Sequence, residues 1–142
     1  MKVRDIMTRH VLRIGSEEPV EAAARMLTHY NVGILPVCGQ DGRICGVITD
    51  RDLVTRCMAP GRKPAELKVK DVMTGRLVTV GPDAHTSVAA NLMGREQVRR
   101  LPVMENGKLC GMVTLGDLAA TEEGNMEAAD ALQSITSNIC KK

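Results

Sequence analysis

The sequence carries one eight-residue pattern twice, as GVITDRDL at residues 46–53 and as GMVTLGDL at residues 111–118. In each copy a glycine opens an apolar run that ends at a Thr, and an Asp follows that Thr three residues later. A Thr-x-x-Asp pair is typical of a capping box, because the hydroxyl accepts a backbone N–H of the first helical turn and the acid favours the positive end of the helix dipole. The pattern predicts a strand followed by a helix, and it leaves open whether Thr49 and Asp52 also bind a ligand.

The repetition extends beyond these two stretches. VRDIMT at residues 3–8 returns as VKDVMT at residues 69–74, and GILPV at residues 33–37 returns as RRLPV at residues 99–103. One residue is lost where CGQDG becomes MENG, which indicates a turn, since turns tolerate deletions. The chain is therefore predicted to contain two copies of one unit. We expect repeat 1 at residues 3–58, a linker at 59–68, repeat 2 at 69–122 and a tail at 123–142.

Each repeat is expected to contain the elements β-α-β-β-α. The predicted strands cover residues 11–14, 33–38 and 43–48 in repeat 1, and 77–80, 101–104 and 108–113 in repeat 2. The first helix is predicted over residues 18–30 and 84–96, and the second begins at the Thr of each Thr-x-x-Asp pair. Asp-Gly and Asn-Gly between the last two strands are hairpin signals, because both turn residues are expected at positive φ. The fold class is therefore α/β, with the two halves sharing a core.

The first helices of the repeats and the tail have apolar faces. The first helix of each repeat is apolar over more than one stripe, which favours contact with another copy and predicts a homodimer. The tail is predicted to be helical, with an apolar side that either packs on the module or binds a partner: Met126, Ala129, Leu132 and Ile135–Ile139.

Composition excludes several function classes. The net charge is +2, Phe and Trp are absent and Tyr30 is the one tyrosine, which argues against nucleic-acid binding. No apolar run approaches the ~18 residues of a membrane span, and the N-terminus lacks a secretory core. We therefore expect a soluble, cytoplasmic protein without membrane contact.

No arrangement of residues indicates catalysis or metal binding. The sequence has no P-loop, Rossmann glycine pattern or G-x-S-x-G, and its three His lie in unlike contexts. Its five Cys are odd in number and lack C-x-x-C spacing, so neither a disulfide framework nor a zinc site is indicated. Cys45 and Cys110 are expected to be buried thiols that act as small hydrophobes. The protein is predicted to be non-enzymatic, with no metal and no required cofactor.

The doubled pattern resembles a tandem pair of CBS domains, a regulatory motif called after cystathionine β-synthase. The resemblance is carried by D-h-M-T at residues 5–8 and 71–74, h-P-V at 35–37 and 101–103, and G-h-h-T-x-x-D-L in both repeats. It implies two repeats packed about a pseudo-twofold axis into one module. It also implies binding of AMP, ADP or ATP in clefts between the repeats, and a regulatory effect on a separate partner. The alternatives are S-adenosylmethionine, NAD or a cyclic dinucleotide as the ligand, or a ligand-free dimerisation module.

The same resemblance implies two unequal sites. In each, the Asp of T-x-x-D is expected to take the ribose hydroxyls, and the helix that starts at the Thr to favour phosphate. Site A has two arginines where site B has Gly-Ile, and arginine presents a planar fork suited to phosphate. Site A is predicted to comprise Thr49, Asp52, Met73, Val78, Arg99 and Arg100 with Leu101 and Pro102, and site B to comprise Thr114, Asp117, Met7, Leu12, Gly33 and Ile34 with Leu35 and Pro36.

Overall fold

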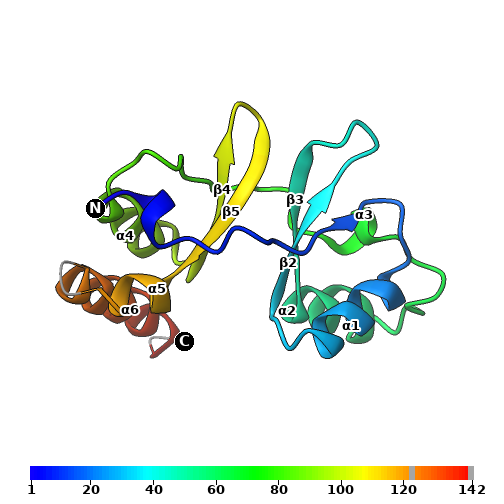
Figure 1. Cartoon of the computed structure of the whole chain (residues 1–142). Helices are drawn as coiled ribbons and strands as arrows, with labels where there is room; N and C mark the ends of the chain where they lie inside the picture. Colours follow the sequence, from blue (N-terminus) through cyan, green and yellow to red (C-terminus); the bar gives the residue numbers. More distant parts are fainter. Residues whose placement is uncertain (122–123, 141–142) are drawn as a thin grey trace. The chain divides into compact units, whose positions relative to one another are not determined.

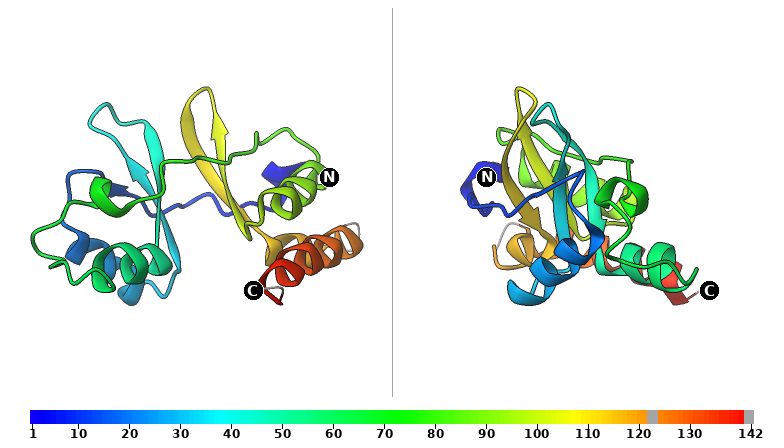
Figure 2. Two further views of the ribbon diagram at one scale, coloured as in Figure 1. Left: turned by 180° about the vertical axis from the view of Figure 1, so that it is seen from behind. Right: turned by 90° about the vertical axis from the view of Figure 1, so that its right-hand side faces the viewer.

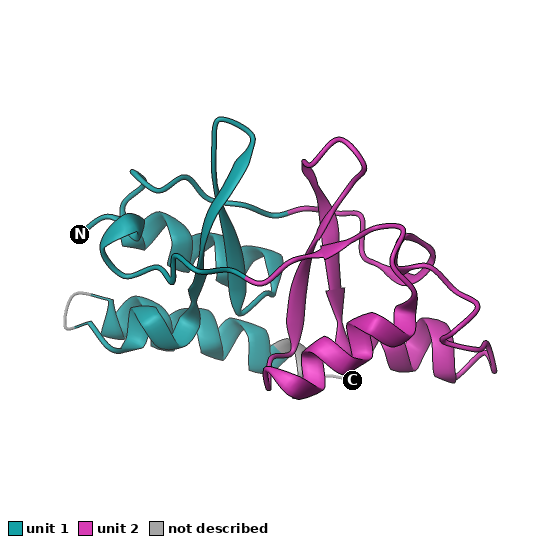
Figure 3. Cartoon of the chain, turned by 45° about the vertical axis from the view of Figure 1, so that its right-hand side comes forward, with its two compact units in different colours: residues 1–11, 78–142 teal, residues 12–77 magenta. Residues whose placement is uncertain are grey.

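The computed structural model describes residues 1–121 and 124–140, and side chains up to residue 137 of the last helix (Figure 1). The chain forms two compact units, which Figure 3 shows in teal and magenta. Unit 1 consists of Met1–Val11 and Val78–Lys142, and unit 2 of Leu12–Leu77. Each unit therefore contains the hairpin of one repeat and the D-h-M-T segment of the other. The predicted α/β class is confirmed.

Unit 2 is built on a three-stranded sheet in the order β1-β2-β3. Strand β1 (Ile14–Gly15) is parallel to β2 (Ile34–Cys38), which is antiparallel to β3 (Ile44–Thr49). The helices are α1 (Val20–His29), α2 (Asp50–Asp52), its π-helical continuation η2 (Leu53–Met58) and α3 (Val69–Val72). Helix α1 begins two residues later than predicted, because Pro19 is its N-cap rather than a member of its first turn.

Unit 1 repeats this plan with one addition. Its hairpin pairs β4 (Arg100–Glu105) with β5 (Lys108–Thr114), and its helices are η1 (Val3–Asp5), α4 (Thr86–Glu96) and α5 (Leu115–Ala119). Helix α6 (Asn125–Cys140) follows and has no counterpart in unit 2 among the described residues. Figure 2 shows α6, orange to red, running beside α4 and α5.

The first strand of each repeat is shorter than predicted. Strand β1 has two residues, and residues 77–80 form a single bridge, between Val80 and Val103. Val80 donates its N–H to the carbonyl of Pro102 and accepts one from Met104. The next rung would need an N–H from Pro102, which a proline does not have, so the ladder ends there. Pro36 occupies the same place in β2.

The two hairpin turns differ. Asn106 and Gly107 both have positive φ, 52° and 78°, as predicted. In the other hairpin only Gly42 does, at 81°, and the Asp41 carboxylate instead accepts the N–H of Arg43. The expectation of two positive-φ residues is therefore wrong for the first hairpin, whose longer loop needs only one.

Helix α6 packs on unit 1 through a side that shares only Ile135 with the predicted one among the described side chains. Its buried residues are Ala128, Ala131 and Ile135, and Ala128 and Ala131 belong to the core of unit 1 together with residues of α4 and α5. The backbone of α4 comes close at Gly94, where an added Cβ would lie 3.5 Å from the Cα of Ala131. Met126, Ala129 and Leu132 are exposed instead. The predicted contribution of Ile139 lies outside the described side chains.

Each D-h-M-T segment helps to form the core of the unit that it joins. Val3 is fully buried in the core of unit 1, and Val69 and Val72 are fully buried in the core of unit 2. Burying a valine side chain stabilises a fold by about 1.5–3 kcal/mol. The exchange of segments between the repeats is therefore part of what holds each unit together.

Candidate functional site

Both Thr-x-x-Asp pairs form complete capping boxes. The Thr49 hydroxyl accepts the Asp52 N–H at 3.1 Å, and Asp52 Oδ2 accepts the Thr49 N–H at 3.0 Å. Thr114 and Asp117 repeat this exchange at 3.1 and 2.9 Å. The capping interpretation is confirmed in both repeats, and one oxygen of each carboxylate is thereby occupied.

The carboxylate of Asp52 has further internal partners. The Thr74 hydroxyl donates to Oδ1 and Oδ2 at 3.1 and 3.3 Å, and Arg56 Nε lies 4.0 Å from Oδ1. Arg56 is itself held by hydrogen bonds from Nη1 to the carbonyls of Val72 and Met73. Asp52 is 7% exposed. Its polar atoms are therefore committed to unit 2.

The carboxylate of Asp117 is more open. It is half-buried, and among the described residues its one hydrogen-bond donor is the Thr114 N–H. The position of Arg56 is taken by Thr121, whose hydroxyl donates to the carbonyl of Leu118 instead. Oxygen Oδ1 of Asp117 therefore remains available to an outside donor.

Two arginines lie at the start of the strand that pairs with Thr114. Arg100 is the cross-strand partner of Thr114, and the carbonyl of Arg99 accepts the N–H of Leu115. Directly opposed residues in antiparallel strands have Cβ atoms about 4.5–5.5 Å apart on the same face. Within the part of the chain that the structure describes, neither guanidinium forms an ion pair. The arrangement places fixed positive charge next to Thr114.

The corresponding place in unit 2 is uncharged. Ile34 is the cross-strand partner of Thr49, and the carbonyl of Gly33 accepts the N–H of Asp50. The predicted sites had combined residues of both units: Val78, Arg99 and Arg100 with Thr49 and Asp52, and Leu12, Gly33 and Ile34 with Thr114 and Asp117. Those combinations remain predictions, whereas the structure places the arginines with the Thr-x-x-Asp pair of their own repeat.

The two methionines of the predicted sites reach the hairpins through close backbone pairing. Thr8 exchanges both backbone hydrogen bonds with Met112, and Thr74 does so with Val47. A Cβ on Gly111 would lie 2.6 Å from Met7 Sδ, and one on Gly46 would lie 2.4 Å from the Thr74 carbonyl oxygen. The glycines that open the duplicated pattern therefore admit Met7 to the hairpin of Thr114, and Met73 to the hairpin of Thr49.

Four predicted site residues have inward side chains. Leu35 and Leu101 belong to the cores of units 2 and 1, and Pro36 and Pro102 are buried beside them. A ligand at either hairpin would reach these residues through their backbone.

The matched cysteines are half-buried rather than fully buried. Cys45 and Cys110 donate their thiols to the carbonyls of Val37 and Val103 at 3.5 and 3.3 Å. Burial raises the pKa of both thiols, and a raised pKa lowers the thiolate fraction on which reactivity depends. Over the described ranges, no cluster of three or more His, Cys, Asp or Glu could hold a metal ion. The same ranges contain no helix that could cross a membrane.

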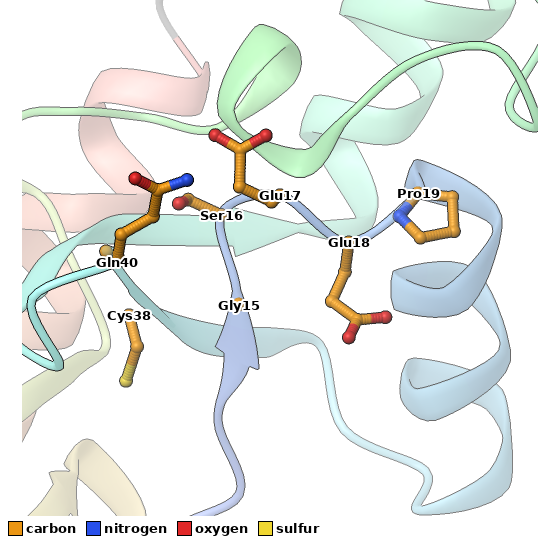
Figure 4. Close-up of a pocket in the computed structure, with 8 residues that line it drawn as sticks. Gly15, Ser16, Glu17, Glu18, Pro19, Cys38 and Gln40 are labelled. Atoms are coloured by element: carbon orange, nitrogen blue, oxygen red, sulfur yellow. The ribbon is translucent and has the colours of Figure 1, made fainter.

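A pocket of about 350 Å³ lies at the other end of the unit 2 sheet, between the loop before α1 and the end of β2 (Figure 4). Glu17, on its rim, bonds Lys68 and Lys70, and these bonds lower the pKa of its carboxyl. None of the predicted site residues lines it. The lining consists of Gly15, Ser16, Glu17, Glu18, Pro19, Cys38, Gly39 and Gln40.

Comparison with known sequences decides the family. The CBS domain pattern matches residues 3–59 and 69–123. The chain belongs to the CBS domain family. This CBS pair is 41% identical to the uncharacterized protein YlbB of Bacillus subtilis over 136 residues, which cover 95% of this chain and 91% of YlbB.

Solved structures share the fold of this CBS pair. A crystal structure of Hypoxic Response Protein I, solved with two coordinated zinc ions, is 35% identical, has a TM-score of 0.77, and the match covers 84% of this chain and 97% of that one. The CBS domain pair of protein MJ0100 was solved in complex with 5′-methylthioadenosine and S-adenosyl-L-methionine. It is 24% identical, with a TM-score of 0.76, and the match covers 88% of this chain and 98% of that one, so this likeness concerns the fold alone.

Proposed function

We propose that this CBS pair is a non-catalytic regulatory module that binds an adenine nucleotide at the Thr114–Asp117 loop and signals to a separate protein. One observation carries the proposal. Arg100, which has no ion-pair partner among the described residues, is the cross-strand partner of Thr114, and Thr114 forms the capping box with the half-buried Asp117, which has a free oxygen.

A carboxylate and a guanidinium suit the ribose and the phosphate of a nucleotide, respectively. A carboxylate accepts hydrogen bonds from vicinal ribose hydroxyls, and charge-assisted bonds of this kind are the strong ones. A guanidinium donates two parallel bonds to phosphate oxygens. Arg99 precedes β4 and Asp117 lies in α5, and the two segments meet at one end of the β4–β5 hairpin, where the N–H of Leu115 bonds the Arg99 carbonyl. The charge needed for a phosphate and the acceptor needed for a ribose therefore occur together.

The Thr49–Asp52 loop supports the same chemistry less well. A ribose there would have to compete with the Thr74 hydroxyl for the Asp52 carboxylate. Ile34 also supplies no charge for a phosphate. We propose that unit 1 provides the stronger nucleotide contacts and that unit 2 contributes weaker ones.

Titration calorimetry with adenosine, AMP, ADP and ATP tests the proposal. A hydrogen bond to a charged group contributes about 1.5–3 kcal/mol, so Arg100→Ala should weaken a phosphate-bearing ligand roughly ten- to a hundredfold. Adenosine should be little affected, and the loss should grow with phosphate charge. Ile34→Ala is the matched control, because Ile34 faces Thr49 as Arg100 faces Thr114. With one Tyr and no Trp, the protein absorbs little at 260 nm, so a co-purified nucleotide would be visible there.

Two other results would point elsewhere. S-adenosylmethionine has no phosphate, so strong binding of it that is unchanged in Arg100→Ala would favour a different adenosyl ligand. If no member of the panel binds, and NAD and cyclic dinucleotides also fail, the ligand-free dimerisation module becomes the better proposal.

A further inference from the structure

The pocket in front of helix α1 lies where Gly15 has no side chain. Gly15 of β1 is paired in parallel with Cys38 of β2, so the two positions face the same side of the sheet. A Cβ on Gly15 would lie 3.5 Å from Glu18 Cγ, which is an ordinary van der Waals distance. Figure 4 shows Gly15 between the side chains of Cys38 and Glu18. The pocket therefore has a thiol and a carboxylate on either side of an open glycine.

The Cys38 thiol differs from the other described thiols. Cys45, Cys57 and Cys110 each donate a hydrogen bond to a backbone carbonyl, and Cys57 is only 2% exposed. Of the four cysteines whose side chains the structure describes, Cys38 alone forms no hydrogen bond through its thiol, and it lines the pocket. The reactivity of a thiol depends on its access as well as on its thiolate fraction. Cys38 is therefore the described thiol best placed to react with a small molecule.

The charged side chains that line the pocket are both acidic. Glu17 is already bonded to Lys68 and Lys70. Glu18 is exposed and forms no ion pair with any residue that the structure describes. Figure 4 shows the two carboxylates on opposite sides of the loop, so the lysines on Glu17 leave Glu18 unpaired. A positively charged group in the pocket would therefore find a partner in Glu18.

The hydroxyl of Ser16 is an independent indication of a ligand. Ser16 is 8% exposed and lines the pocket, and its hydroxyl forms no hydrogen bond within the described part of the chain. Figure 4 shows this hydroxyl directed toward Gln40, at the rim of the same pocket. A buried hydroxyl without a partner costs free energy. An N–H donor of a ligand in the pocket would supply the missing hydrogen bond.

These three polar groups are absent together from the other repeat. The glycine is kept as Gly81, but the groups around it are replaced by residues that have no thiol, carboxylate or hydroxyl. The counterparts of Ser16, Glu18 and Cys38 are Pro82, Ala84 and Met104. The repeat therefore folds without these groups, which leaves a role other than folding open to them in unit 2.

We propose that Cys38 is a site of reversible modification by a small disulfide whose halves carry an ammonium group, and that the pocket holds the resulting adduct. The Cys38 thiolate attacks one sulfur of the small disulfide, whose S–S bond breaks as a new bond to Cys38 Sγ forms. The other half leaves as a thiolate and takes up the proton that Cys38 lost. Cys38 is thereby oxidised and the small disulfide is reduced.

The pocket has the size and the acceptors that such an adduct needs. Its volume of about 350 Å³ lies in the range of small-molecule sites. An ammonium has three N–H donors, and Glu18 and the Ser16 hydroxyl are acceptors in the same pocket. The proposal is independent of nucleotide binding, because none of the residues proposed to hold the nucleotide lines this pocket.

Timed mass spectrometry with three small disulfides tests the proposal on the full chain, in a Cys140→Ser background. Cystamine carries ammonium groups, bis(2-hydroxyethyl) disulfide is neutral, and dithiodiglycolate is anionic. Peptide mapping should find the cystamine adduct first at Cys38, and dithiothreitol should remove it. Glu18→Gln should slow the cystamine reaction roughly three- to fivefold, the scale of an exposed ion pair, and leave the neutral disulfide unaffected. Asp130→Asn, which removes an exposed acid of unit 1, is the matched control and should change neither rate.

Filling the pocket tests its part in the reaction. Gly15 does not have a positive φ, so its backbone accepts a side chain. Gly15→Val should slow the reaction of all three disulfides at Cys38, whereas Gly81→Val, the same change at the matching position of unit 1, should not. Adducts that form first at another described cysteine would overturn the proposal. So would a cystamine rate at Cys38 that Glu18→Gln leaves unchanged, which would mean that Cys38 is an accessible thiol without a binding pocket.

Discussion

The Thr49–Asp52 and Thr114–Asp117 loops have the same sequence pattern and the same capping box, yet they differ in what else they contact. Asp52 is closed in by the Thr74 hydroxyl and by Arg56. Asp117 lacks both partners among the described residues and has Arg100 across the strand from its Thr. After a duplication, one copy can keep the structural role while the other is free to bind. The comparison teaches that a shared motif fixes the local backbone, whereas the surrounding side chains decide whether its acid is available.

The largest loss of folding stability should come from substituting the glycines, Gly46 and Gly111, against which the D-h-M-T segments pack. Gly46→Ala should lower the free energy of unfolding by about 3 kcal/mol, because its Cβ would lie 2.4 Å from the backbone oxygen of Thr74. Gly111→Ala should cost less, about 1–2 kcal/mol, because its nearest atom is the flexible end of Met7 and its nearest backbone atom, the Thr8 carbonyl oxygen, is farther away at 2.9 Å. Urea unfolding followed by circular dichroism measures both. Equal losses would mean that the two segments are held equally tightly.

The two aspartates should separate stability from binding. Asp52→Ala should cost about 2–3 kcal/mol, since it removes a cap and leaves the Thr74 hydroxyl without its acceptor. Asp117→Ala should cost about 1 kcal/mol, the value of a cap alone. A nucleotide at 100 times its dissociation constant adds about 2.7 kcal/mol to stability, and Asp117→Ala should lose most of that gain.

Thermal melts with and without AMP check this prediction. If Asp52→Ala loses the nucleotide response and Asp117→Ala keeps it, the assignment of the open loop is wrong.

The smallest effect concerns ion pairs at equivalent positions of the two units. Glu17 bonds Lys68 and Lys70 in unit 2, and Asp83 bonds Arg4 in unit 1. The pKa of Glu17 is lowered by the hydrogen bonds from Lys68 and Lys70. Its contribution is therefore present above the ordinary carboxyl pKa of 4.5 and is lost as the pH falls through the lowered value.

Glu17→Gln should therefore unfold slightly more easily than the wild type at pH 7, and the difference in stability should vanish at strongly acidic pH. Because the pair is exposed, high salt should also reduce the difference. Asp83→Asn is the matched variant in unit 1. A loss that persists at acidic pH would show that the glutamate acts through packing.

Much of the fold could be predicted because the signals are local and doubled. The Asn106-Gly107 turn, the α/β class and the capping boxes depend on residues close in sequence. The limits of the first strands could not be predicted from β propensity, since Pro102 ends the ladder from the neighbouring strand. On the inward side of α6, Ile135 was predicted, whereas Ala128 and Ala131 were missed because alanines are less conspicuous than Met126 and Leu132.

The candidate site was predictable in its residue types but not in its environment. The pattern identifies Thr49, Asp52, Thr114 and Asp117, and the structure confirms them as caps. The sequence did not predict the hydrogen bond from Thr74 to Asp52, because the two residues are 22 positions apart. It did not predict the pairing of Arg100 with Thr114 either, because that pairing depends on strand register. One sign that the two aspartates differ in their surroundings was present in the sequence. When the two repeats are aligned, Arg56 of repeat 1 corresponds to the uncharged Thr121 of repeat 2.

The exchange of D-h-M-T segments has a consequence for synthesis on the ribosome. Residues 12–77 are contiguous, so unit 2 can close as soon as they have emerged. Met1–Val11 must instead wait for Met112, the partner of Thr8. At about 5–20 residues per second, that delay lasts several seconds. During this interval Val3 is a solvent-exposed hydrophobe on a nascent chain, so this segment folds after unit 2 although it leaves the tunnel before it.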